Sequence, residues 1–265
     1  MFMQSKIQKN LKKTGTEQVW PLERQKTPPL VLGVIPARGG SKSVPRKNIK
    51  PLGGKPLLYY MLSAALASDY LDRVVVSSED DEILLVAEKY GGEEVVLRRP
   101  KHLAQDKTPD VPMLQHAVKT VERNDRCVFD YVVQLHVTTP FVTSDDIDAA
   151  LRMLLQSEAE SIVSVCQVNE YHPIKMKKIV DGRLLQYVDG LKEHSTARRQ
   201  DYEPVFWRNG GLYASKRHIV MDHGRVFGDY VLPYIMPPER SVDMNSVIDF
   251  WTAEAVLKSM KLNKK

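Results

Sequence analysis

Short apolar runs and amphipathic segments alternate along most of the chain. Residues 31–35 form an uninterrupted apolar run closed by Pro36, which is typical of a strand buried on both faces. Residues 56–68 carry apolar side chains at helical spacing behind an N-terminal proline, which predicts a helix. The two patterns recur, with strands predicted at residues 73–77, 94–97, 131–135 and 161–168 and helices at residues 79–90, 111–122 and 143–156.

Repeated strand–helix units predict an α/β fold: a Rossmann-like, doubly wound, mostly parallel sheet with helices on both faces. Residues 211–215 and 230–235 return to strand character, and residues 247–260 predict a closing helix. Between the predicted strands at residues 161–168 and 211–215, residues of about 170–207 lose the regular hydrophobic period. They contain the hairpin signal Asp181-Gly182, so we expect a small inserted arm there. Such sheets bind ligands beyond the carboxyl ends of their strands, which directs attention to the loop after residue 35.

The first 28 residues differ from the rest of the chain, and we expect a flexible basic leader before a single domain over residues 29–265. The leader holds six Lys and Arg residues and two Glu residues, which gives it a net charge of +4, and the whole chain has a net charge of +5. The remaining chain is therefore nearly neutral. A nucleic-acid-binding protein is expected to carry its excess charge on the folded surface, so nucleic acid is not an expected partner. Deletion of the leader should leave catalysis intact.

Several other classes of protein are not expected from the composition. No stretch reaches the roughly 20 apolar residues that span a bilayer, and the N-terminus lacks the apolar core of a secretion signal, so we expect a cytoplasmic protein with no membrane partner. Cys127 and Cys166 are the only cysteines, and neither they nor the seven histidines show metal-ligand spacing. A zinc site is therefore not expected.

The strongest chemical signal is the loop of residues 36–48, PARGGSKSVPRKN, directly after the first predicted strand. It combines four cations, two adjacent glycines and hydroxyl groups. Glycines let backbone N–H groups approach a phosphate, and Arg and Lys offset its charge. The loop matches neither G-x-x-x-x-G-K-[ST] nor G-x-G-x-x-G. We interpret it as a phosphate-binding loop; the alternative is an ordinary basic surface turn.

This loop resembles the signature A-R-x-x-S-K-x-x-P-x-K-N of the acylneuraminate cytidylyltransferases, also called CMP-sialic acid synthetases. In that family the loop wraps the triphosphate of CTP. The resemblance implies that Arg38 and Lys47 are catalytic, because they would hold phosphates and stabilise charge on the leaving pyrophosphate. Ser43 departs from the family, which usually has Gly there. The loop residues expected to bind nucleotide are Ala37, Arg38, Gly39, Ser41, Lys42, Lys47 and Asn48.

Two further segments resemble the family. Residues 99–106 resemble its R-P-x-x-L-A-x-D stretch, which implies that Arg99 and Asp106 lie at the cytosine pocket. His136 stands where the family has the Gln of Q-P-T-S-P, which touches the sugar, so the identity of the sugar stays open. With the H-P-x-K and R-Q…N-G-x-x-Y segments, the residues expected to bind the sugar are His136, Thr138, Thr139, Lys175, Arg199, Gln200, Asn209 and Tyr213.

A metal site is implied before the closing helix. Family members typically have D-x-D there, with carboxylates that bind Mg²⁺, and this chain has Asp243 and Asn245. An amide oxygen can still ligate Mg²⁺, which prefers hard oxygen ligands. The alternative is that the two residues merely cap the closing helix.

The resemblance implies an enzyme that transfers CMP from CTP to the anomeric hydroxyl of a nonulosonic acid, of sialic or legionaminic type, and releases pyrophosphate. Its partners would be CTP and an acidic 2-keto sugar, its cofactor Mg²⁺, and its assembly a homodimer formed through the inserted arm. Two alternatives remain. One is a cytidylyltransferase for the eight-carbon acid Kdo, and the other is a nucleotide-binding relative with weakened catalysis.

Overall fold

The computed structural model describes residues 28–168, 171–188, 190 and 202–262. Its strands are β1 (Val31–Pro36), β2 (Pro51–Leu52), β3 (Lys55–Pro56), β4 (Arg73–Ser78), β5 (Val96–Arg98), β6 (Tyr131–Leu135), β7 (Ser161–Gln167), β8 (Lys177–Val180), β9 (Arg183–Gln186), β10 (Phe206–Lys216) and β11 (Val231–Ile235). Its helices are α2 (Leu57–Ala67), α3 (Asp81–Gly91), α4 (Asp110–Asp125), α5 (Ser144–Leu155), α6 (Arg217–Met221) and α7 (Val247–Leu262).

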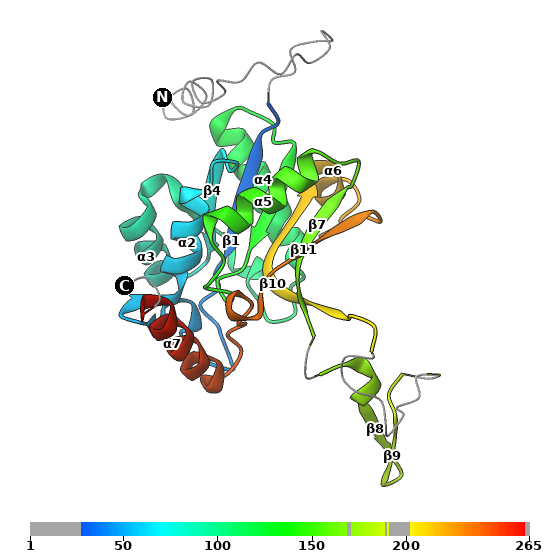
Figure 1. The fold of residues 1–265 in the computed structure, drawn as a ribbon. Coiled ribbons are helices and arrows are strands. Elements are labelled where there is room, and N and C mark those ends of the chain that lie inside the picture. The colour runs from blue at the N-terminus through cyan, green and yellow to red at the C-terminus, as the bar shows by residue number, and fades with distance from the viewer. Residues whose placement is uncertain (1–27, 169–170, 189, 191–201, 263–265) are drawn as a thin grey trace.

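A seven-stranded sheet forms the centre of the molecule, in the order β11-β7-β10-β6-β1-β4-β5 (Figure 1). β1 pairs in parallel with β4 and β6, and β4 pairs in parallel with β5. β10 runs antiparallel to both of its neighbours, β6 and β7. The α/β fold with a mostly parallel, doubly wound sheet, as predicted from the sequence, is therefore confirmed, with one reversed strand.

Helices cover both faces of the sheet because successive side chains of its strands point to opposite sides. Val31 and Ile35 of β1 pack into a core shared with α2, α3 and α5. Leu32 and Val34 of the same strand pack into a second core with α4. The continuous apolar run in the sequence follows from this double burial.

The chain extends away from the sheet after β7 as a small arm (Figure 1). Its described part contains the hairpin β8–β9, in which Val180 pairs with Arg183. Asp181 and Gly182 form the turn with positive φ angles of 48° and 73°. A turn of this kind favours Gly and Asp, which explains why the Asp-Gly pair was a usable signal. The predicted leader lies outside the described residues, except for its last residue, Pro28.

Some element boundaries differ from those predicted. The helix predicted from residue 79 begins at Asp81, because Asp80 caps it by accepting a hydrogen bond from the backbone N–H of Ile83. α6 and the short pair β2–β3 were not predicted. In the described part of the chain, no helix combines the length and apolar character needed to span a membrane.

Candidate active site

A cavity of about 520 Å³ lies beyond the carboxyl ends of the parallel strands. The chain order runs from β1 to β4 and β5 on one side and continues at β6 on the other, which makes β1 and β6 the switch point of the sheet. α/β sheets bind ligands at such points. The predicted site residues that line this cavity are Arg38, Ser41, Lys42, Lys47, Asn48, Arg99, Asp106, His136, Thr138 and Asn245.

Two cations of the loop after β1 meet one carboxylate at the cavity. Arg38 Nη1 donates to Asp106 Oδ1 at 2.7 Å, and Lys42 Nζ lies 2.5 Å from Asp106 Oδ2. The Lys42 ammonium and the Arg38 guanidinium hold the pKa of Asp106 below its usual value. Arg38 and Lys42 thus converge on a single anionic group, as they would have to on a phosphate.

Lys47 is more deeply placed than these two residues. Its Nζ donates to the carbonyl oxygen of Met244 at 2.7 Å, which ties the loop to the segment before α7. Burial lowers the pKa of Lys47, and the Asp243 carboxylate opposes this effect. A partly desolvated ammonium acts more strongly on a nearby phosphate than an exposed one does.

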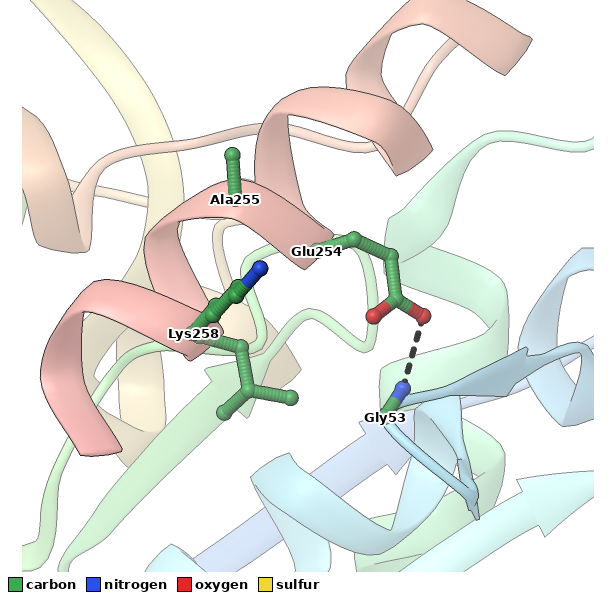
Figure 2. Close-up of a pocket in the computed structure, with 5 residues that line it drawn as sticks. Gly53, Glu254, Ala255 and Lys258 are labelled. Carbon is green, nitrogen blue, oxygen red and sulfur yellow. Dashed lines mark hydrogen bonds between the residues drawn. The ribbon is translucent and has the colours of Figure 1, made fainter. Parts of the chain in front are cut away.

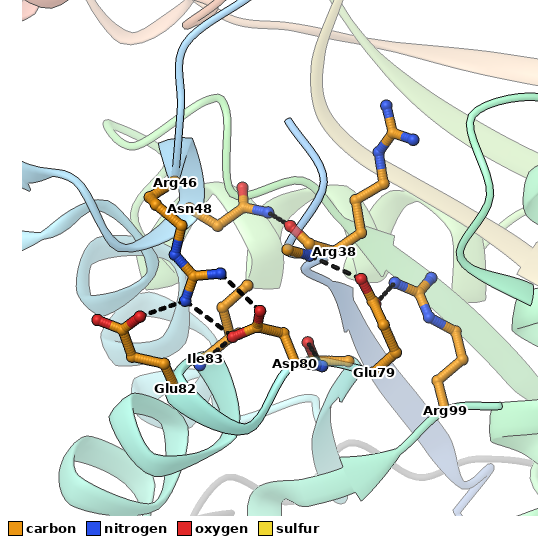
Figure 3. Close-up of polar contacts among 10 residues, drawn as sticks. Arg38, Arg46, Asn48, Glu79, Asp80, Glu82, Ile83 and Arg99 are labelled. Carbon is orange, nitrogen blue, oxygen red and sulfur yellow. Dashed lines mark hydrogen bonds and ion pairs between the residues drawn. The ribbon is translucent and has the colours of Figure 1, made fainter. Parts of the chain in front are cut away.

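The start of the loop is held by the framework around it (Figure 3). The backbone N–H of Gly39 donates to Glu79 Oε1 at 2.8 Å, and Asn48 Nδ2 donates to the Arg38 carbonyl oxygen at 2.9 Å. A Cβ atom on Gly39 would overlap the side chain of Asp80. Ala37 is buried and adds a bond from its N–H to the Ser77 carbonyl oxygen. Glycine at position 39 is therefore required by close packing.

The end of the loop is fixed by an ion pair with the start of α3 (Figure 3). Arg46 adopts a left-handed conformation, with φ of 54°, and forms two bonds to the Asp80 carboxylate, at 2.5 and 2.9 Å. It also contacts Glu82. The hydrogen bonds from Arg46 lower the pKa of Asp80. Both ends of the loop after β1 are therefore attached to the junction between β4 and α3.

Arg99 follows β5 and is bound by Glu79, the residue that also binds the loop after β1. Its Nη2 donates to Glu79 Oε2 at 3.2 Å, and its side chain is only 5% exposed. Burial lowers the pKa of this guanidinium, while Glu79 opposes the effect. Its Nε has no hydrogen-bond partner among the described residues. Glu79 thus binds the loop after β1 with one oxygen and Arg99 with the other (Figure 3).

Aromatic rings lie near the end of β6, where His136 lines the cavity and the predicted site residue Tyr213 does not. The rings of His136 and Tyr213 meet edge to face, with centroids 5.1 Å apart, and Phe227 lies beyond Tyr213. Burial lowers the pKa of His136, so its imidazole is neutral at pH 7. Burial raises the pKa of Tyr213. The Nε2 atom of His136 is buried without a partner among the described residues.

Thr139 and Asn209 lie in a buried network. Thr139 Oγ1 donates to the Asn209 carbonyl oxygen at 3.0 Å. Asn209 Oδ1 accepts from Ser164 Oγ at 2.6 Å, and its Nδ2 donates to Ser241 Oγ at 2.8 Å. Both residues are fully buried. This placement supports a structural role for them and does not support the predicted contact with the sugar.

Of the sugar-binding residues predicted in the arm, only Lys175 lies in the described part of the chain. Lys175 ends the 3-10 turn Pro173–Lys175, beside the hairpin β8–β9, and is not among the residues that line the cavity. Arg199 and Gln200 lie outside the described residues. Within the described part of the chain, Gln134, His136 and Thr138 line the cavity at and after the end of β6.

The residues predicted to hold Mg²⁺ lie directly before α7. Asn245 Nδ2 donates to Asp243 Oδ2 at 2.6 Å, which leaves the second carboxylate oxygen and the amide oxygen for a cation. These are hard ligands of the kind that Mg²⁺ takes together with phosphates and water. No group of three or more His, Cys, Asp or Glu side chains suited to a metal occurs among the described residues. The pair therefore fits a metal held mainly by substrate.

The alternative role of Asp243 and Asn245 as caps of the closing helix is filled by other side chains. Ser246 N–H donates to Asp249 Oδ2 at 2.6 Å, and Asp249 N–H donates back to Ser246 Oγ at 3.4 Å. This reciprocal pair caps α7. The side chains of Asp243 and Asn245 are not needed for that purpose.

A second groove of about 370 Å³ lies along α7 (Figure 2). There Gly53 N–H donates to Glu254 Oε1 at 2.8 Å. Lys258 is the one cation among the described residues that line the groove. It therefore offers no cluster of positive charges for a phosphate chain.

Several polar residues at the site were not singled out from the sequence. Three of them are Glu79, which anchors the loop and Arg99, and Asp110 and Gln134, which line the cavity. Glu79 and Asp110 carry little signal, because acids at the start of helices are common. Gln134 offered one: it is a polar residue inside an otherwise apolar predicted strand.

The fold and the cationic cavity at its switch point define a nucleotide-binding α/β protein. The chain belongs to the cytidylyltransferase family, whose model matches residues 32–223, and it is therefore a nucleotidyltransferase. The resemblance seen in the sequence is confirmed at this level.

Individual relatives agree with this assignment. The chain is 29% identical to a pseudaminic acid cytidylyltransferase of Campylobacter jejuni, over 86% of this chain and 96% of that protein. It is 30% identical to an N-acylneuraminate cytidylyltransferase of Escherichia coli, over 83% of this chain and 50% of that protein. A solved structure of a CMP:2-keto-3-deoxy-manno-octonic acid synthetase complexed with CTP has a TM-score of 0.64 and 15% identity, and covers 87% of this chain and 99% of its own. That last similarity shows the fold alone.

Proposed function

We propose that the protein transfers CMP from CTP to the anomeric hydroxyl of a nonulosonic acid and releases pyrophosphate. The observation that carries the proposal is the cavity into which one loop brings Arg38, Lys42 and Lys47 beside the buried Arg99. A triphosphate requires concentrated positive charge and aligned donors. The names of the relatives support an acidic nine-carbon sugar as the acceptor.

The reaction would be an in-line displacement at phosphorus. The anomeric oxygen attacks the α-phosphorus, and the bond from that phosphorus to the oxygen it shares with the β-phosphate breaks. Pyrophosphate leaves with the electron pair, and the proton of the hydroxyl passes to solvent. Arg38 and Lys47 offset the charge that gathers on pyrophosphate, so catalysis comes mainly from positioning and electrostatic stabilisation. Mg²⁺ held by Asp243 and Asn245 would neutralise further phosphate charge.

The acceptor is proposed as a nine-carbon acid, in preference to the eight-carbon Kdo. In the family that the sequence resembles, the R-Q…N-G segment is a feature of the nine-carbon branch, and this chain has Arg199-Gln200 and Asn209-Gly210. His136 stands where that family has Gln, so the preferred acid is expected to depend on this half-buried side chain, whose pKa is lowered by burial.

A pyrophosphate-release assay with CTP tests the proposal. Sialic, legionaminic and pseudaminic acids are compared with Kdo at equal concentration. Release with at least one nine-carbon acid and not with Kdo is expected. Release with Kdo alone would assign the eight-carbon function. Release with none of the acids, together with measurable CTP binding, would indicate a relative that binds nucleotide without turnover.

We also propose that two copies of the chain associate through the arm. Ile179 and Leu184 face each other across the hairpin β8–β9 and are 76% and 68% exposed. A two-stranded hairpin has marginal stability in water unless its apolar side chains are covered. A second copy of the arm would cover them. The cytoplasmic location stays a prediction from the sequence.

A further inference from the structure

The floor of the cavity carries two polar groups that the proposed chemistry has not used. Gln134, on β6, is 2% exposed and lines the cavity. Its Nε2 donates to Asp110 Oδ2, in the first turn of α4, at 3.0 Å. Its Oε1 is buried and has no hydrogen-bond partner among the described residues.

This bond determines what the floor can offer to a ligand. An ionised carboxylate only accepts hydrogen bonds, so the amide nitrogen of Gln134 must face Asp110 and the amide oxygen must face elsewhere. The groups left for a ligand are therefore acceptors: Gln134 Oε1 and the remaining lone pairs of Asp110. A buried acceptor without a donor destabilises the folded protein, and a ligand group that donates a hydrogen bond to it removes this penalty.

Phosphates and carboxylates do not suit this position. Both would bring negative charge and further acceptors towards the Asp110 carboxylate. The cations that suit a phosphate lie on the loop after β1. The floor requires uncharged donors at short spacing, and adjacent hydroxyl groups of a sugar provide two such donors.

We propose that Asp110 and Gln134 form a hydroxyl-recognition subsite for a substrate of the transfer reaction. The subsite rests on the proposed function. Two sources share this chemistry, the ribose of CTP and the acidic sugar. His136 follows the end of β6 two residues after Gln134, and its ring contacts Tyr213, the cross-strand neighbour of Gln134, so the subsite adjoins the place where the acidic sugar is expected.

Binding measurements separate the two sources without requiring turnover. Calorimetry would follow CTP, 2′-deoxy-CTP and 3′-deoxy-CTP, and then the preferred sugar acid in the presence of CDP. The test variant is Q134L, which removes the acceptor at similar volume. The matched control is Q115L, on α4, whose Nε2 donates to the Val220 carbonyl oxygen away from the cavity.

If the subsite binds ribose, Q134L lowers the affinity for CTP about tenfold, and the variant no longer prefers CTP to one of the two deoxy analogues. If it binds the acidic sugar, CTP binding is unchanged and the acid binds about tenfold more weakly. The control retains wild-type values in both cases. D110N, at an exposed position, is expected to weaken binding of the same ligand as Q134L. It provides the test if Q134L does not fold.

The proposal is overturned if both variants keep wild-type affinity for every ligand, or if they weaken all ligands, deoxy analogues included, to the same extent. A wild-type enzyme that releases no pyrophosphate with any acid would refute the proposed function. It would leave the ribose comparison valid, so the two failures can be told apart.

Discussion

At the scale of single residues, the site contains cations that are partly removed from water, and this burial disfavours their charged form. Lys47 is an example: burial lowers its pKa, while the nearby carboxylates of Asp243 and Asp249 favour its charged form. Arg99 is subject to the same effect and is supported by Glu79. The sequence indicated which cations belong to the site. It could not indicate their depth, because burial depends on Met244 and Asp243, almost 200 residues further along the chain.

Lys47→Ala is expected to lower kcat/KM by about a hundredfold or more, because a charge that stabilises the leaving group is lost. The melting temperature should change little. Pyrophosphate release at pH 7.5 and a thermal melt measure the two quantities. Unchanged turnover in this variant would contradict the role assigned to Lys47.

The lowered pKa of Lys47 also predicts a pH effect. The ammonium is lost as the pH rises through its folded-state pKa, which lies below 10.5, so activity should fall on the alkaline side. Lys47→Arg keeps its charge and should move this limb to higher pH. Profiles of kcat/KM from pH 7 to 10.5 test this, with Lys50→Arg as a control. Identical alkaline limbs in the wild type and K47R would refute the assignment.

Asp106→Asn removes the carboxylate that partly neutralises Arg38 and Lys42. Because these cations then face the ligand unpaired, the affinity for pyrophosphate should rise by roughly threefold to tenfold. Calorimetry with pyrophosphate isolates this effect from any contact with the base. An affinity equal to or below that of the wild type would show that Asp106 does not compete with pyrophosphate for Arg38 and Lys42.

At the scale of elements, the loop after β1 is shaped by the junction between β4 and α3. The sequence predicted both the loop and the neighbouring helix, but assigned Glu79 and Asp80 to the first turn of that helix. Instead Asp80 caps the helix and holds Arg46, while Glu79 holds Gly39. Acidic residues near the start of a helix are explained by the helix dipole alone, so the pattern did not reveal that Glu79 and Asp80 also bind the loop after β1.

The two glycines of the loop provide a matched pair of variants. A Cβ on Gly39 would overlap the side chain of Asp80, whereas a Cβ on Gly40 meets nothing within 4 Å. Gly39→Ala should therefore displace the loop and weaken CTP binding by about tenfold or more, with a stability loss of about 1–3 kcal/mol. Gly40→Ala should stay within about twofold of the wild type. Equal affinities for the two variants would contradict the close packing at Gly39.

At the scale of the whole molecule, the sequence predicted the sheet class and the arm but not the strand order. β10 is the clearest case, because it inserts between β6 and β7 and runs against both. Its reversal follows from the arm, which carries the chain away from the end of β7 and back. Sequence periodicity reports which residues are buried, not which strands are neighbours. For the same reason, Asp110 and Gln134 became a pair only once α4 and β6 were placed.

The assembly can be tested at the arm without touching the cavity. The double variant I179D/L184D places charges on the exposed face of the hairpin β8–β9, so we expect a dimeric wild type and a monomeric variant by light scattering. Leu85→Asp, at a position on α3 that is 64% exposed, should remain dimeric. A monomeric wild type, or a double variant that stays dimeric, would rule out association through the arm.

The central claim is that the loop after β1 holds the triphosphate of CTP, and a crystal structure of the complex with CTP and Mg²⁺ tests it most directly. The account predicts phosphate oxygens within hydrogen-bond distance of Arg38, Lys42 and Lys47, with the base beside Arg99. CTP bound in the groove between Gly53 and Glu254, or anywhere else away from this loop, would contradict it.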